Sequence, residues 1–360
     1  MTSPVDWALA ERIATRLTPR DPFAASYLYG SLSADFDECT AEAEELVEAE
    51  TGLRSLAGPA RARVVDRPAW VRANVHAFQR LLHPTLERLG ARAGSGRSVP
   101  LAITRKVSAF EVGSLLAWMS GRVLGQYDLL VVDDDSATEQ DLVYYVGPNV
   151  LGLERRYGFP PREFRLWLAL HEVTHRAQFT GVPWLRQHYL GLVQQALSMV
   201  DTDPGQLLSA LRSAASGLRQ GRDAFDLGGL AAVIASEEQR VALGKVAGLM
   251  ALLEGHGDVT MDRAGAGRVP SAERFSRVLR ERRKTASPLA RTFRRLIGLE
   301  AKLAQYEYGE RFIAEVEQAA GEGALDVVWQ GPDRLPTLAE IKLPEQWLAR
   351  VGLPSSPVVV

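Results

Sequence analysis

The sequence contains very little cysteine. Cys39 is the single cysteine among 360 residues, so the chain has no disulfide framework within it and no zinc ribbon or other metal site built from several thiolates. A lone cysteine in such a chain is most often a packed or surface thiol, and we expect Cys39 to be one. The structural and metal-binding roles of paired cysteines are therefore excluded.

An excess of charge of one sign and long apolar runs are also lacking. Lys and Arg total 42 against 44 Asp and Glu, which gives a net charge of −2, so no overall basic surface favours nucleic acid as a partner. No segment approaches the roughly 18 uninterrupted apolar residues of a membrane span. Residues 1–17 carry Asp6, Glu11 and Arg12 in place of the apolar stretch of a signal peptide. We therefore expect a soluble, cytoplasmic protein without a membrane span.

What the chain does have is helical periodicity over most of its length. Apolar and charged residues alternate at helical spacing in four N-terminal segments: Trp7–Leu17, Ala41–Leu53, Pro68–Leu82 and Ala109–Leu124. Tyr127–Val132 and Leu142–Val146 are instead rich in β-branched and aromatic residues, and we expect them to form two antiparallel strands. The second strand is either an exposed edge that pairs with an extended peptide substrate or an ordinary internal strand. The predicted fold class is α+β, predominantly helical, with a small antiparallel sheet.

The most informative feature is an H-E-x-x-H pentapeptide, defined by His171, Glu172 and His175. The flanking residues predict a helix that begins near Pro161 and ends near Gly181. The two histidines are one helical turn apart, so both imidazoles project from one face and can bind one metal ion. The glutamate lies on a neighbouring face, where it can reach a water molecule rather than the metal. This pattern is the signature of a zinc hydrolase.

A catalytic zinc needs a third protein ligand, and Glu254 is the best candidate. It continues an apolar i, i+4 line along a helix that we expect to end there, because glycines follow at 255 and 257. A cation would neutralise a carboxylate at the end of such an apolar face. The alternatives are that Glu254 is a solvated helix end or that His256 is the ligand. Asp258 could accept the free ring N–H of a zinc-bound histidine.

These residues together predict a hydrolytic mechanism with one zinc ion per chain. Zinc on His171, His175 and Glu254 would polarise a carbonyl and lower the pKa of a water molecule. Glu172 would take the proton from the water and pass it to the leaving amine. The oxyanion needs a further donor, for which His256, a tyrosine or an arginine are candidates.

Several stretches carry a resemblance to a known family. They lie in the part of the chain that begins at about Asp66, and they are Leu168–Phe179, Val182–Arg186, Leu252–Asp262, Gly298–Phe312 and Leu335–Glu340 with Trp347. These stretches resemble an actinobacterial zincin-like family of zinc-dependent metallopeptidases, first described as a domain of unknown function. One branch of that family is labelled as associated with the biosynthesis of a deazaflavin coenzyme.

The resemblance implies a zincin-like fold of the gluzincin type, with metal on His171 and His175, Glu254 as the third ligand and Glu172 as the base. Three residues of the similar stretch Gly298–Phe312 either line the cleft or serve helix packing: Lys302, Tyr306 and Tyr308. The expected organisation has three parts. Residues 1–97 form an N-terminal helical region that ends in a glycine- and serine-containing connection. Residues 98–270 form the zincin-like core, and residues 271–360 form a C-terminal helical region and tail that pack on it.

Three functions fit these features. The first is a zinc-dependent hydrolase that cleaves a peptide or protein substrate, and the second is a zinc-stabilised binding or scaffold protein without turnover. The third is an amidohydrolase that acts on a small metabolite, since the same zinc site supports either amide substrate. Glu172 favours an enzyme, because a protein that only binds has no chemical need for a base at that position.

Overall fold

The computed structural model describes residues 5–23, 26–93, 101–129, 141–198, 237–284 and 299–354. Contacts divide the chain into two compact units. The first unit comprises Met1–Gly181 and Thr260–Phe275, and the second comprises Val182–Val259 and Ser276–Val360. The expected boundary at residue 97 and the second half of the strand expected at 127–132 lie outside the described residues. No helix in the described ranges is long and apolar enough to cross a membrane.

The first unit contains a three-stranded mixed sheet. Its strands are β1 (Arg61–Val65), β2 (Gly125–Tyr127) and β3 (Leu142–Val146), in the order β1-β3-β2. The structure has an antiparallel strand pair, β2 with β3, but β2 shares only Tyr127 with the segment expected at 127–132. β1 adds a parallel partner on the other side of β3. Of the two alternatives for Leu142–Val146, the internal strand is therefore the correct one, because β3 lies between β1 and β2. All five β3 residues are buried, as expected for a strand covered on both faces.

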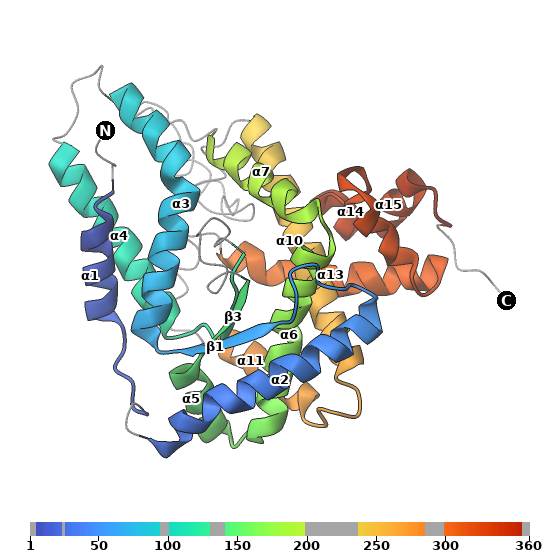
Figure 1. The fold of residues 1–360 in the computed structure, drawn as a ribbon. Helices are drawn as coiled ribbons and strands as arrows, with labels where there is room; N and C mark the ends of the chain where they lie inside the picture. Colours follow the sequence, from blue (N-terminus) through green and yellow to red (C-terminus); the bar gives the residue numbers. More distant parts are fainter. Residues whose placement is uncertain are drawn as a thin grey trace. The chain divides into compact units, whose positions relative to one another are not determined.

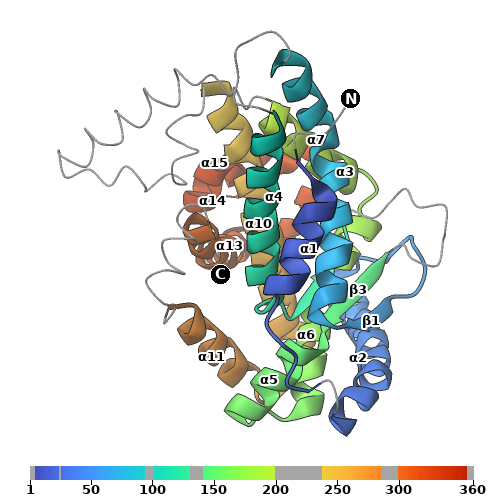
Figure 2. The same ribbon diagram turned by 90° about the vertical axis from the view of Figure 1, so that its left-hand side faces the viewer.

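One face of the sheet packs against three helices, α1 (Trp7–Leu17), α3 (Arg67–Ala93) and α4 (Leu101–Ser120). Figure 2 shows these helices side by side. Alternate β3 residues enter this core together with side chains from the helices and β1: Leu142, Tyr144, Val146, Val65, Ala14, Trp70, Val71, Val75 and Leu116. Helix α1 begins and ends where its apolar periodicity predicts. At its start, the Asp6 carboxylate caps the helix by accepting a hydrogen bond from the Leu9 amide.

The opposite face of the sheet is covered by α2 (Tyr27–Thr51) and α6 (Pro161–Gly181), with α5 (Gly147–Tyr157) following β3 (Figure 1). Tyr145 of β3 points to this side. Its ring stacks on Phe36 at 3.8 Å between centroids, and its hydroxyl lies 2.9 Å from that of Thr40. Both partners are on α2, so the sheet and α2 form one packed body.

Helix α6 is fastened to α2 by charge. Three arginines of α6 pair with acidic residues of α2, as Arg162–Glu42, Arg165–Asp35 and Arg176–Glu44. The Arg162 guanidinium also donates to the buried Cys39 sulfur at 2.6 Å. Burial raises the pKa of the Cys39 thiol to about 11, although Arg162 acts in the opposite direction. Cys39 is thus a packed thiol within the first unit, as expected.

The second unit is built on α7 (Leu185–Ser198), α13 (Leu299–Ala320) and the greater part of α10 (Glu237–Ala264). Two short 3-10 helices follow α13, η1 (Ala324–Gln330) and η2 (Pro332–Arg334), and then α14 (Leu338–Lys342) and α15 (Pro344–Val351). These C-terminal elements pack on α13 through the buried Trp347, whose ring lies 5.2 Å from that of Phe312. Helix α11 (Ala272–Lys284) joins the two units in sequence.

The expectation that a helix ends at Glu254 is wrong. Helix α10 continues through both following glycines to Ala264. Gly255 has a packing role instead, because a Cβ there would lie 2.4 Å from the Gly309 carbonyl carbon of α13. The glycine therefore allows two helix backbones to cross closely, and that close approach outweighs its low helix propensity.

Candidate metal centre

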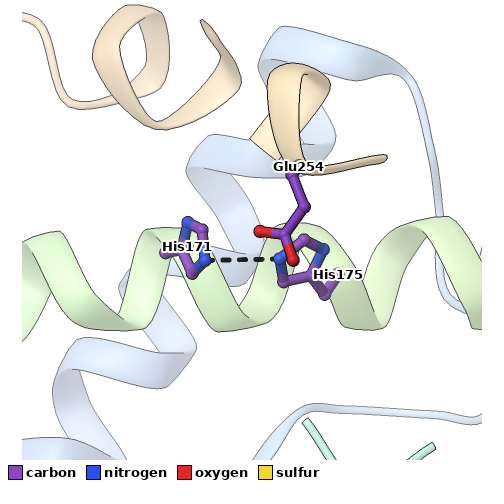
Figure 3. A group of neighbouring side chains, drawn as sticks. All are labelled: His171, His175 and Glu254. Carbon is purple, nitrogen blue, oxygen red and sulfur yellow. Dashed lines mark hydrogen bonds between the residues drawn. The ribbon is translucent and has the colours of Figure 1, made fainter. Parts of the chain in front are cut away.

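Helix α6 carries the H-E-x-x-H residues in its middle turns. It begins at Pro161 and ends at Gly181, as the sequence predicts. His171 and His175 lie on one face, with ring centroids 4.7 Å apart and Nε2 atoms 3.3 Å apart (Figure 3). Two nitrogen ligands of a tetrahedral zinc ion, each at about 2.0–2.1 Å, are separated by about 3.3–3.4 Å. The spacing of the two Nε2 atoms therefore fits one zinc ion.

Glu254 completes a group of possible ligands. The ligand atoms of His171, His175 and Glu254 all lie within 4.8 Å of one another, and in Figure 3 the carboxylate points toward the imidazoles. Among the described residues, this is the group of His, Cys, Asp and Glu side chains that could hold a metal ion. The Glu254 side chain is 8% exposed, and a carboxylate so deeply buried is costly without a positive partner. Two imidazoles and one carboxylate form a donor set that Zn²⁺ takes in catalytic sites.

Glu172 projects from a different side of α6 and reaches the sheet. Its Oε2 accepts a hydrogen bond of 3.0 Å from the backbone N–H of Tyr127 in β2. Its Cγ, Oε1 and Cδ atoms would lie 2.6, 2.7 and 2.9 Å from a Cβ built on Gly125. The carboxylate therefore lies directly on the β2 backbone, in space that only a glycine at 125 leaves open. β2 and not β3 is the edge strand beside the pentapeptide.

Gln178 contacts the second histidine of the pair. Its Oε1 lies 3.0 Å from His175 Nδ1, and the side chain is completely buried. The sequence places Gln178 on the histidine face of the helix but assigns it no role. The residue that the sequence favours for a similar contact, Asp258, is partly buried and lies one helical turn after Glu254 on α10.

His256 lies outside the metal-ligand group. It is buried, and its ring packs edge-on against Trp329 of η1 with centroids 5.1 Å apart. Residues two apart on a helix project about 200° apart, so Glu254 and His256 point to nearly opposite sides of α10. Tyr189 of α7 lies near Glu254, and burial together with the charge of Glu254 raises the pKa of its phenol. A protonated phenol can donate a hydrogen bond, and the sequence gives no signal for this residue.

The other histidines and the three residues of Gly298–Phe312 are exposed, packed against neighbouring side chains, or outside the described residues. His76 and His83 on α3 are exposed. His188 packs against Trp184 with ring centroids 5.8 Å apart. The side chains of Lys302 and Tyr306 lie outside the described residues. The ring of Tyr308 lies beneath the cations of Arg311 and Lys342, at 5.5 and 5.4 Å, which agrees with helix packing rather than with a cleft.

Comparison with known proteins places these features in a family. The model of the zincin-like metallopeptidase family matches residues 5–348. A crystal structure described as "a putative hydrolase with a novel fold", from Chloroflexus aurantiacus, is similar with a TM-score of 0.69 and 28% sequence identity. The similarity covers 97% of this chain and 99% of that chain. No curated protein matches the sequence. The family match spans nearly the whole chain, including the histidine pair, and the chain therefore belongs to the zincin-like metallopeptidase family.

Proposed function

We propose that the protein is a zinc-dependent hydrolase that cleaves a peptide bond, with His171, His175 and Glu254 as metal ligands and Glu172 as the general base. The observation that carries this proposal is the close approach of the three ligand atoms, within 4.8 Å of one another. The base is the residue directly after the first ligand, on the same helix. Family membership supports hydrolysis and a peptide or protein substrate.

The bound zinc would supply a Lewis acid that polarises the substrate carbonyl and lowers the pKa of water. The work of the protein side chains follows from their positions. Glu172 is held on the β2 backbone by the Tyr127 amide, so its carboxylate can take a proton from the attacking water and give it to the leaving amine. Tyr189 lies on α7 near Glu254, and Asp258 lies on α10, the helix that carries Glu254. In this proposal Tyr189 is a candidate donor to the oxyanion.

The first expected result concerns metal content. Purified protein should contain about one zinc ion per chain, measured by elemental analysis after gel filtration. His175→Ala should lose this zinc, because a site with two remaining ligands does not hold the ion firmly. His188→Ala is the matched control, since that histidine contacts Trp184, and it should retain the metal. Wild-type protein that takes up no zinc on dialysis would rule out the proposed site.

Glu172→Gln separates catalysis from metal binding. The amide keeps the shape of the side chain but cannot accept a proton, so the variant should retain zinc while its hydrolysis of a mixed peptide library falls by about 10²–10⁴-fold. Mass spectrometry of the library before and after incubation measures cleavage. Cleavage by Glu172→Gln at the wild-type rate would refute the role of the base. If the zinc-loaded wild type cleaves no peptide, a binding protein or a hydrolase of small amides becomes the better description.

The identity of the third ligand is tested by comparing two residues of α10. Glu254→Ala should weaken zinc binding by at least about 10²-fold, because it removes a ligand. His256→Ala should leave zinc binding nearly unchanged and should instead lower stability, because His256 packs against Trp329. Competition with a chromophoric zinc chelator measures both affinities. The opposite order of effects would transfer the role of ligand to His256.

A further inference from the structure

The side chain of Gln178 lies in an unusual position for an amide. It is 0% exposed and sits on α6 three residues after His175, with its Oε1 atom 3.0 Å from the Nδ1 atom of that histidine. A buried amide is expected to make hydrogen bonds, because removing it from water without them is costly. The contact is formed within one helix, between residues that neighbour each other on its surface. The contact between Gln178 and His175 is therefore made by α6 alone.

With the Gln178 amide oriented so that Oε1 faces the ring, this contact requires a hydrogen on Nδ1 of His175. An amide oxygen has lone pairs and no hydrogen, so it can only accept a hydrogen bond. The Nδ1 atom must then be the donor and must carry the hydrogen. In a neutral imidazole with hydrogen on Nδ1, the Nε2 atom has the free lone pair. That Nε2 atom is the one that lies 3.3 Å from His171 Nε2, in the group of possible metal ligands.

We propose that Gln178 is a positioning residue that fixes His175 in the tautomer with hydrogen on Nδ1 and so directs the Nε2 lone pair toward the metal position. The purpose of this arrangement rests on the proposed zinc site, but the tautomer itself does not. Partners of this kind orient metal-binding histidines in many proteins, and they are commonly carboxylates or backbone carbonyls. Gln178 is neutral, so it orients the ring without adding a second negative charge beside Glu254.

The tautomer can be measured directly on the full-length protein. Long-range ¹H–¹⁵N NMR spectra of the ¹⁵N-labelled chain, recorded without metal and at a pH where the imidazoles are neutral, distinguish the two ring nitrogens. The His175 signals are assigned by their loss in His175→Asn. We expect hydrogen on Nδ1 in the wild type and in Gln178→Glu, which retains an acceptor oxygen. Gln178→Leu should give a mixture of tautomers. Hydrogen on Nε2 in the wild type, or an unchanged spectrum in Gln178→Leu, would overturn the proposal.

Zinc affinity provides the second measurement. Gln178→Leu should bind zinc about 10–100-fold more weakly than the wild type, the usual cost of losing such a partner. Gln178→Glu should restore binding to at least the wild-type affinity. Thr174→Val is the matched control, because Thr174 is also completely buried on α6 but its hydroxyl donates to the Leu170 carbonyl at 2.7 Å. This control should keep the wild-type affinity and tautomer.

The two measurements separate failure of this inference from failure of the proposed function. Hydrogen on Nδ1 of His175 together with no zinc binding would refute the zinc hydrolase and leave only the tautomer fixed by Gln178 intact. Zinc binding that Gln178→Leu leaves unchanged would refute the role of Gln178 and leave the hydrolase intact. Should Gln178→Leu not fold, the wild-type spectrum and the affinity of Gln178→Glu still decide the question.

Discussion

Under the proposed function, Gly125→Ala is expected to abolish most of the peptide hydrolysis while the protein stays folded and the proposed site still binds zinc. The new methyl group would lie 2.6–2.9 Å from three atoms of the Glu172 side chain, so one of the two must move. The Glu172 side chain is flexible and the β2 backbone is paired with β3, so the carboxylate is the group that moves. A displacement of about 1 Å at a reacting group can lower the rate by about 10²-fold, and we expect a loss of this size in kcat.

The control for this prediction is a second glycine substitution in the first unit. Gly30→Ala on α2 adds the same methyl group where nothing lies within 4 Å, and it should leave activity unchanged. The free energy of unfolding of both variants, measured in urea, should lie within about 1 kcal/mol of the wild-type value. Both variants should contain one zinc ion per chain. A Gly125→Ala variant with wild-type kcat would show that the base does not depend on the space that this glycine leaves.

Arg176→Met is expected to produce the largest loss of stability. Arg176 is 1% exposed and donates to Glu44 at 2.6 Å, to Asp141 at 2.6 and 2.9 Å, and to the Gly58 carbonyl at 2.6 Å. Methionine fills similar space but leaves two partly buried acidic groups, Glu44 and Asp141, without this cation. Removing one partner of such a network costs about 3–5 kcal/mol, which is a large part of the stability of an ordinary domain. Urea denaturation followed by circular dichroism measures it.

The matched control is an exposed pair at the C-terminal end of α2, formed by Glu48 on the helix and Arg54, which follows the helix end at Thr51. Arg54 lies 3.8 Å from Glu48, one turn after Glu44, and the two side chains are 81% and 48% exposed. Arg54→Met should cost less than about 1 kcal/mol, because water and salt screen an exposed ion pair. An equal loss of unfolding free energy in Arg176→Met and Arg54→Met would contradict the view that the Arg176 network stabilises the protein because it is buried.

The features of the fold that local sequence determines were predictable. The bounds of α1 and α6 follow from apolar periodicity, a capping aspartate and a proline start. The strand β3 follows from its β-branched and aromatic residues. The bounds of its antiparallel partner were not predicted, because Gly125-Gln126-Tyr127 contains no β-branched residue. Strand β1 was not predicted, because Arg61-Ala62-Arg63 shows little apolar alternation. Its pairing partner is about eighty residues away in sequence, as Arg61 opposite Leu142 illustrates, and no local pattern reports such a contact.

Part of the candidate site was likewise predictable from local sequence, and part depends on tertiary contacts. The i, i+4 spacing is enough to bring His171 and His175 together, and an apolar helical line pointed to Glu254. The glycines at 255 and 257 were misread as a helix end, although Gly255 serves the close backbone crossing with Gly309 of α13. Gly125 had no signal of its own, since its role is to leave space for a residue of another element. The roles of Gly255 and Gly125 follow from their tertiary contacts and not from the residue type alone.

The support of Glu172 by β2 has a consequence for the order of folding. The histidine pair needs only one turn of helix, which forms early in a chain. The amide that holds Glu172 is 45 residues away, and Glu44, one of the two acidic partners of Arg176, is 132 residues away. Such contacts form only after long loops close, at a cost in chain entropy. A nascent chain would therefore acquire its paired imidazoles before it acquires a placed base. Its capacity to hydrolyse would arise with the completed sheet, when the chain is itself no longer an extended substrate.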